Sequence, residues 1–286
     1  MYQAQIENSG GESLTLNGNE TRWQVLSITG LNPPPAQINT TNISGMDGAR
    51  FNSSKLGTRN IVIMLRINGN VEDNRQELYR FFRTKDVCTF YFSNDNRDVL
   101  IQGYVETVEC DLFAQGQTMQ ISIICPYPYF QAIQNVVVDI SNEVATFSFP
   151  FSINQGEPIP FTNYISNRVT NVKNNSETET GVMIGIYVLS DVGKIQIRDT
   201  DTGEYITLVY SFLENDRIVI NTEKGNKNIS LIRNGVETNL FTALQEGSIF
   251  FQLKVGDNHF GYLVNDGSDD DAVYIVFDFS YKYRGV

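Results

Sequence analysis

The sequence has few of the residues that enzymes use for nucleophilic or metal-assisted chemistry. Its 286 residues include one histidine, His259, and three cysteines, Cys88, Cys110 and Cys125. A serine or cysteine nucleophile needs a base beside it, and a zinc site needs several closely spaced histidine or cysteine ligands. We therefore interpret His259 as a turn or surface residue and the scattered cysteines as small buried apolar residues. Phosphate-loop, dinucleotide-binding and His-Glu-x-x-His motifs are also absent, so we predict no catalytic residues, no cofactor and no enzyme activity.

Basic residues are outnumbered and long apolar runs are missing. The 21 Lys and Arg residues face 33 Asp and Glu residues, which gives a net charge of -12, and most of the acidic excess lies in residues 134–286. A nucleic-acid-binding surface should be basic, so we expect no direct nucleic-acid recognition. The first residues, Met1–Gln5, show neither a basic start nor an apolar segment, and no run reaches the length of a membrane span. We therefore expect that the protein is made in a cytoplasm and does not insert into a membrane.

Carboxylates are the remaining candidates for a metal site. The segment 266–271 is an acidic loop, and its weak candidate ligands for Ca²⁺ are Asp266, Asp269, Asp270 and Asp271. The segment Asp199–Gly203 resembles the start of a calcium loop, but Tyr210 stands where such a loop needs a glutamate. Solvated turns explain both acidic segments more simply, so we predict no metal site.

Aromatic and β-branched residues are plentiful in the first half, which favours strands. Apolar residues alternate along Arg59–Asn68, as expected for a strand with one buried face. A helix is expected after it, with Asn74 as N-cap, Glu77 completing a capping box, and Leu78, Phe81 and Phe82 forming its apolar face. The prolines that follow Asn32 predict a long polar loop over Leu31–Gly48, because proline cannot continue a strand ladder.

The second half consists of short apolar segments separated by turns. The expected strands are 136–140, 145–151, 180–189, 194–198, 205–210, 217–221, 228–232, 248–255 and 273–279. Short strands at regular spacing without helices indicate a β-sandwich of jelly-roll type. The rigid aromatic run Pro126–Phe130 precedes them, so we place a domain boundary near residue 133. This divides the chain into residues 1–133 and 134–286.

The order of several short motifs resembles the distal tail protein family of long-tailed phages. In the first half these motifs are Thr29–Pro34, Asp47-Gly48 with Phe51, Arg59–Ile61, Leu78 with Phe81-Phe82, Phe90–Phe92, Asn94–Arg97, Gly103–Glu106 and Pro126–Phe130. In the second half they are Arg217–Thr222 with Gly225, Asn234-Gly235, Ser248–Leu253 and Gly256–Asn258. One departure is Asn221, where the family more often has an acidic residue. The resemblance covers nearly the whole chain.

The resemblance implies a mainly β fold and a structural role in the virion. The first domain would be a β-sandwich or split barrel with one α-helix, and the second a galectin-like jelly-roll β-sandwich. The family forms a hexameric ring at the tail tip that joins the tail tube protein to the tail-tip hub or tail-associated lysin. The ring also serves as an attachment platform for receptor-binding or other baseplate proteins, and it is assembled in the host cytoplasm. A carbohydrate-binding module for adhesion to the host surface is the alternative function, since jelly rolls often bind sugars.

Ring contacts would be made by the first domain, and the region Leu31–Phe51 is our choice for them. It is long, polar and braced by prolines, and an ordinary surface loop is the competing interpretation. The residues expected at the interface are Leu31, Asn32, Pro33, Pro34, Asp47 and Phe51.

Overall fold

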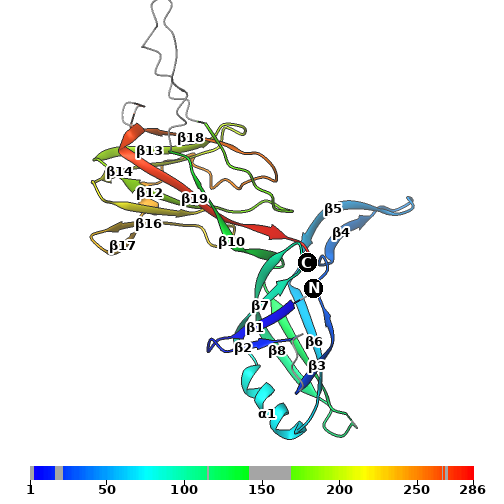
Figure 1. Cartoon of the computed structure of the whole chain (residues 1–286). Coiled ribbons are helices and arrows are strands. Elements are labelled where there is room, and N and C mark those ends of the chain that lie inside the picture. Colours follow the sequence, from blue (N-terminus) through cyan, green and yellow to red (C-terminus); the bar gives the residue numbers. More distant parts are fainter. Residues whose placement is uncertain (1–2, 17–21, 115, 142–168, 266, 268–269) are drawn as a thin grey trace, which may run out of the picture. The chain divides into compact units, whose positions relative to one another are not determined.

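The computed structural model of the chain describes residues 3–16, 22–114, 116–141, 169–265, 267 and 270–286. It divides into two compact units, Met1–Gln134 together with Lys282–Val286, and Asn135–Tyr281. The chain enters the second unit within β10 (Phe130–Asp139) and returns to the first within β19 (Val273–Tyr283). Both units are mainly β, as predicted, and α1 (Val71–Phe81) is the single α-helix of the described residues (Figure 1). No described helix is long and apolar enough to span a bilayer.

The first unit is built on one antiparallel sheet whose neighbouring strands follow the order β2-β1-β7-β8-β9-β6-β3. Its strands are β1 (Gln3–Asn8), β2 (Ser13–Thr15), β3 (Trp23–Thr29), β6 (Arg59–Ile67), β7 (Val87–Ser93), β8 (Asp98–Cys110) and β9 (Thr118–Cys125). The long β8 pairs with β7 through its first half and with β9 through its second half. The two halves of the sheet share one core, which makes this unit a sandwich. Among the described residues, β2 and β3 remain edge strands, so the sheet does not close into a barrel.

The alternation in β6 explains how this core forms. Ile61, Ile63, Leu65 and Ile67 all point inward and are at most 2% exposed. Burying each of these side chains stabilises the fold by about 1.5–3 kcal/mol relative to leaving it in water. A strand that places every second residue in the core can be recognised from its sequence, and the predicted strand is confirmed.

Helix α1 begins one turn earlier than the sequence suggested. Asn70, not Asn74, is the N-cap, so the predicted capping box at Asn74 is wrong. Asn74 lies inside the first turn of the helix, and its Nδ2 donates a hydrogen bond of 2.6 Å to the carbonyl of Asn68. Leu78 and Phe82 are buried as expected. An asparagine can bond backward to the preceding chain as well as cap a helix, and the sequence pattern does not distinguish the two.

A β-hairpin stands where the sequence predicted a long polar loop. Strands β4 (Ala36–Asn42) and β5 (Ala49–Leu56) form their own two-stranded sheet, which extends away from the rest of the first unit (Figure 1). All residues of both strands are exposed except Leu56, which is half-buried. The loop prediction is wrong because neither face of this hairpin is buried, so its sequence shows no alternation of apolar and polar residues.

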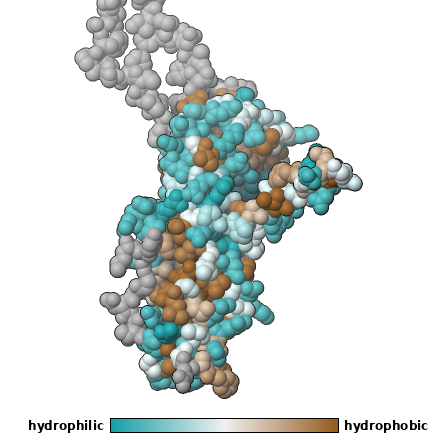
Figure 2. Space-filling view, turned by 90° about the vertical axis from the view of Figure 1, so that its right-hand side faces the viewer, coloured by the Kyte–Doolittle hydropathy of each residue, from teal (hydrophilic) through white to brown (hydrophobic). Residues whose placement is uncertain are grey.

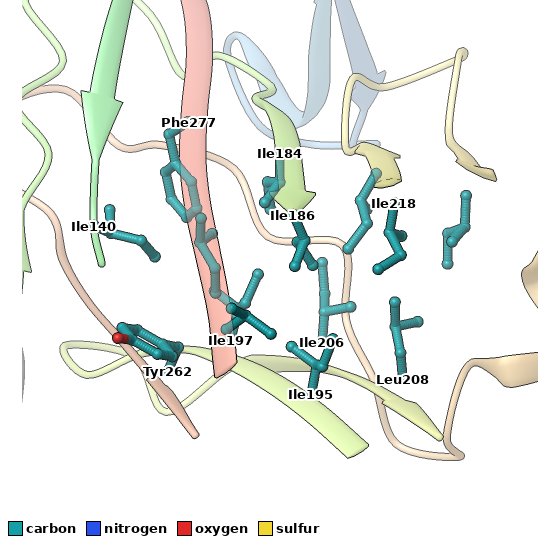
Figure 3. Packing of buried hydrophobic residues seen from close by; sticks show 14 of the residues in the cluster. Ile140, Ile184, Ile186, Ile195, Ile197, Ile206, Leu208, Ile218, Tyr262 and Phe277 are labelled. Atoms are coloured by element: carbon teal, nitrogen blue, oxygen red, sulfur yellow. The ribbon is translucent and has the colours of Figure 1, made fainter. Parts of the chain in front are cut away.

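The second unit is a sandwich of two antiparallel sheets. One sheet has the order β17-β16-β15-β12-β19-β10 and the other β11-β18-β13-β14. The remaining strands are β11 (Thr170–Asn171), β12 (Met183–Val188), β13 (Val192–Asp199), β14 (Tyr205–Phe212), β15 (Arg217–Asn221), β16 (Asn228–Arg233), β17 (Val236–Asn239) and β18 (His259–Val264). Ile184 and Ile186 of β12 face Ile195 and Ile197 of β13 across the core (Figure 3).

Two strand predictions in this unit need comment. The strand expected over residues 248–255 is wrong, because only Leu253 forms a bridge there, with Thr180. The apolar residues of that segment pack on the core individually: Phe251 and Leu253 are 1% and 0% exposed. The strand expected over residues 145–151 lies outside the described residues.

Candidate functional site

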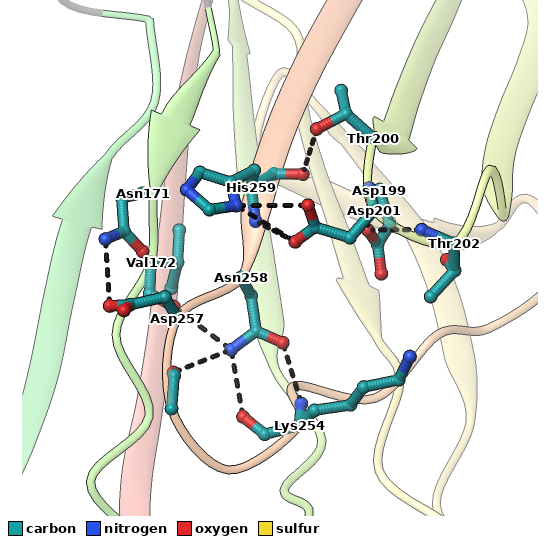
Figure 4. Close-up of polar contacts among 11 residues, drawn as sticks. Asn171, Val172, Asp199, Thr200, Asp201, Thr202, Lys254, Asp257, Asn258 and His259 are labelled. Atoms are coloured by element: carbon teal, nitrogen blue, oxygen red, sulfur yellow. Dashed lines mark hydrogen bonds and ion pairs between the residues drawn. The ribbon is translucent and has the colours of Figure 1, made fainter.

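His259 lies at the start of β18 and contacts the turn that follows β13. Its Nδ1 is 3.0 and 3.1 Å from the two carboxylate oxygens of Asp201 (Figure 4). The backbone N–H of His259 also donates to Asp201 at 3.1 Å, and these bonds lower the pKa of Asp201. Both side chains are exposed. The pair therefore joins a turn to a strand at the surface of the second unit.

The structure describes only some of the carboxylates that were considered as calcium ligands. Asp199 is 2% exposed, and its Oδ1 accepts the N–H groups of Asp201 and Thr202 at 2.8 and 3.1 Å. Asp271 is exposed. The other acidic candidates, Asp266, Asp269 and the side chain of Asp270, lie outside the described residues. In the part of the chain that the structure describes, no three His, Cys, Asp or Glu side chains are grouped as metal ligands.

The cysteines of the first unit lie mainly in its core. Cys88 and Cys125 are buried, and burial raises their pKa values to about 12 and about 11. Thiols with such pKa values stay protonated at neutral pH and are poor nucleophiles. Cys110 is half-buried, so the expectation of full burial is wrong for this residue.

A buried arginine organises the base of the hairpin. Arg59, 2% exposed, donates from Nε to the carbonyl of Pro128 at 2.8 Å and from Nη1 to the carbonyls of Gly30 and Asn32, the latter at 2.7 Å. Its Nη2 donates to the carbonyl of Arg284 at 2.5 Å. The guanidinium also stacks on Phe130, with Cζ 4.5 Å from the ring centroid. One side chain thus joins three distant segments of the chain.

The returning segment Lys282–Val286 completes this junction. Arg97 donates to the carbonyl of Gly285 at 2.8 Å and stacks on the ring of Tyr283 at 4.5 Å. The N–H of Val286 donates to the carbonyl of Leu31 at 3.2 Å. The sequence reasoning named both arginines only within the family motifs and did not predict their role at this junction, because backbone carbonyls, their hydrogen-bond acceptors, leave no trace in residue type.

The predicted interface residues fall at the two ends of the hairpin. Leu31 and Pro34 are half-buried at its base, and Asn32 and Pro33 are exposed beside them. The other two residues, Asp47 in the turn and Phe51 on β5, are exposed. The structure therefore brings the first four together at the Arg59 junction and separates them from the last two.

In the first unit, exposed apolar side chains lie on the hairpin and on an outer sheet face, and hydrophobic surface is visible on this unit in Figure 2. Many other exposed apolar side chains lie on the second unit. We define the outer sheet face by Leu26 on β3, Val62 and Met64 on β6, Tyr104 on β8 and Ile124 on β9. Leu26 and Tyr104 are exposed, and the other three are half-buried. Val62, Met64 and Ile124 point away from the core, as their alternation with Ile61, Ile63 and Ile123 requires.

Two family models together match most of the chain. Residues 11–125 match the phage tail protein RIFT-related domain, and residues 175–281 match the C-terminal domain of the siphovirus-type tail component. The chain belongs to the phage distal tail protein family. The resemblance deduced from the motifs is thereby confirmed, and the chain is a structural protein of a phage tail. No curated protein sequence matches it.

Solved structures show the same fold at low sequence identity. The SPP1 Dit (gp 19.1) protein, described as a paradigm of the hub adsorption apparatus in phages that infect Gram-positive hosts, is 13% identical, with a TM-score of 0.70 over 98% of this chain and 99% of that one. A chain of the phage p2 baseplate in its activated conformation with Sr is 12% identical, with a TM-score of 0.55 over 98% of each chain. A chain of the p2 baseplate activated with Ca is 14% identical, with a TM-score of 0.51 over 97% and 98%.

Proposed function

We propose that this tail component acts by assembly, as a subunit of a hexameric ring at the tail tip. The ring would join the tail tube protein to the tail-tip hub or tail-associated lysin and would carry receptor-binding or other baseplate proteins. The subunit would be made in the host cytoplasm and would function without catalysis, nucleic-acid recognition or membrane insertion. The projecting hairpin is the observation that supports this proposal most directly.

The hairpin carries apolar side chains that a partner molecule would bury. Ile38, Met46 and Phe51 are 63%, 67% and 60% exposed. A two-stranded hairpin is marginally stable alone, and one with both faces in water gains no hydrophobic stabilisation from its own chain. Large apolar side chains on such an element gain burial only when a partner covers them. A second copy of the chain is the partner proposed here.

The outer sheet face of the first unit is the surface proposed to receive the hairpin of a neighbouring copy. Its apolar side chains are only half-covered within one subunit, and a hairpin laid across it would bury them. The contact is head-to-tail, since two different surfaces meet, and head-to-tail contacts that close by rotation generate rings.

Shortening the hairpin tests the proposal. Gln37 and Lys55 are directly paired across β4 and β5, so replacing residues 38–54 with Asn-Gly joins them through a two-residue turn. We expect native mass spectrometry and negative-stain microscopy to show rings for the natural chain and monomers for this variant. The thermal midpoint of the first unit should stay near that of the natural chain, because the hairpin contributes little to the core.

A milder variant tests the apolar side chains of the hairpin separately from its backbone. Replacing both Met46 and Phe51 with serine keeps the hairpin and removes two of its three most exposed apolar side chains. It should weaken ring formation without changing the hairpin's backbone. Intact rings from the shortened variant would refute the role of the hairpin, and a natural chain that stays monomeric at every concentration and forms no ring in tail particles would refute the ring itself.

A further inference from the structure

A groove crosses the outer face of the larger sheet of the second unit. Its volume is about 640 Å³, within the range of small-molecule sites. Strand register arranges the outward side chains of three neighbouring strands in rows. Arg217, Tyr187 and Tyr274 form the first row, and Val219, Gly185 and Val276 form the second. The third row consists of Asn221, Met183 and Asp278.

Gly185 lies at the centre of these three rows, and its missing side chain leaves the space of the groove above the sheet. Its φ is not positive, so its backbone does not require glycine. A Cβ built there would meet only Cε2 of Tyr187, at an ordinary contact distance of 3.7 Å. Glycine in a strand interior lowers stability, and it is often found where a ligand approaches the backbone closely. Among the residues that the structure describes, packing gives no reason for a missing side chain at this position.

The first row provides an aromatic wall with a cation beside it. The rings of Tyr187 and Tyr274 have centroids 5.9 Å apart and are tilted by 49°, and each residue is 38% exposed. Cζ of Arg217 lies 5.3 Å from the centroid of the Tyr187 ring, so the guanidinium borders the wall. Tyrosines offer an apolar ring and a polar hydroxyl at little cost in side-chain entropy. Such a wall suits a ligand with one apolar face and a hydroxylated edge.

Asp278 indicates that the ligand carries hydrogen-bond donors. It lies four residues from Tyr274 along β19, about 13 Å away in an extended strand. One carboxylate oxygen, Oδ1, is buried without a hydrogen-bond partner. A buried acceptor without a donor is unfavourable. A rotation of the Asp278 side chain would bring Oδ1 to the groove, where a hydroxyl-rich ligand would supply the donor and an aliphatic protein side chain would not.

We propose that this groove binds a short oligosaccharide, with a pyranose ring against Tyr187 and Tyr274 and the chain running over Gly185 toward Asp278. The groove has room for about two or three pyranose rings. Arg217 and Asp278 would supply a donor group and an acceptor group at the two ends. The inference rests on the second unit alone and does not depend on ring formation.

Titration of the full chain with disaccharides tests the proposal. Cellobiose, lactose and chitobiose would be added separately to ¹⁵N-labelled protein while amide chemical shifts are recorded. We expect at least one of them to cause saturable shifts confined to β12, β15 and β19. Gly185→Val should raise the Kd at least tenfold while keeping or raising the melting temperature, since a β-branched side chain suits a strand.

A matched pair of tyrosine variants separates binding from folding. Tyr274→Ala removes half of the aromatic wall. Tyr210→Ala removes a tyrosine that is 40% exposed on the other sheet and also has an arginine, Arg233, beside its ring at 5.8 Å. Only the first should abolish saccharide binding. No saturable shift with any of the three sugars would overturn the proposal, as would shifts that survive Gly185→Val or groove shifts caused by an apolar peptide alone.

Discussion

Replacing Arg59 should destabilise the first unit more than any surface substitution. Arg59→Met keeps the aliphatic contact with Phe130 but leaves four carbonyls, those of Gly30, Asn32, Pro128 and Arg284, without their donor. Four hydrogen bonds at a net value of about 1–1.5 kcal/mol each correspond to about 4–6 kcal/mol. Burial opposes this gain, since it lowers the pKa of Arg59 by disfavouring the charged form. We therefore expect a net loss of about 3–5 kcal/mol, because the four carbonyls stay in a buried region without a donor.

The only tryptophan of the chain makes this loss measurable in one unit. Trp23 is 2% exposed in the core of the first unit, so its fluorescence reports the unfolding of that unit in urea. Arg59→Lys should lose part of the stability, because an ammonium group cannot reach four carbonyls with the geometry of a guanidinium. Arg66→Met, an exposed position on the same strand, is the control. An unfolding free energy for Arg59→Met within about 1 kcal/mol of the natural chain would refute the reasoning.

Two further predictions concern other single positions. Hydrogen bonds from Arg233 lower the pKa of Asp216, so this pair stabilises the second unit above the pKa of an unfolded aspartate, and the contribution is lost as pH falls through the lower folded value. Asp216→Asn should lower the urea midpoint of the circular dichroism transition at pH 7. The urea midpoint of the natural chain should fall between about pH 4 and pH 2, and this fall should be smaller in the variant. An equal fall in both proteins would contradict the prediction. Gly30 and Gly45 both have positive φ, but a Cβ at Gly30 would lie 2.0 Å from the carbonyl oxygen of Asn60, and one at Gly45 would meet nothing. Gly45→Ala should cost about 1 kcal/mol and Gly30→Ala several times more, and equal melting temperatures would show that the contact with Asn60 is not limiting.

The features that could be predicted from sequence are those in which burial of one face makes apolar and polar residues alternate regularly. Strand β6 was recognised because Ile61 and its alternate neighbours all enter the core, and the sandwich of the second unit follows from many such segments. Strands β4 and β5 were missed for the same reason, since apolar periodicity reports burial and not backbone conformation. The hairpin is fully extended backbone with water on both faces, and residue type alone does not separate that from a loop.

The site residues were not predicted for a different reason. Arg59 and Arg97 act on backbone carbonyls that are distant in sequence, and any residue could supply those acceptors. Gly185 is recognisable only once strand register shows which side chains surround it, because an isolated glycine in an apolar segment has many explanations. The sequence could therefore indicate the region of the hairpin but neither the junction that holds it nor the groove on the second unit.

The use of polar groups within each unit bears on what the chain does. Asp199, Asp216 and Arg59 are the kinds of side chain that bind metals or substrates, yet each is buried and its hydrogen bonds go to its own chain. Their contacts close turns and join segments. The large side chains left exposed on the hairpin and along the groove are mainly apolar or aromatic, and such surfaces gain stability by being covered. This division, in which polar side chains brace the fold and apolar ones remain free for contact, favours a function carried out through binding and assembly.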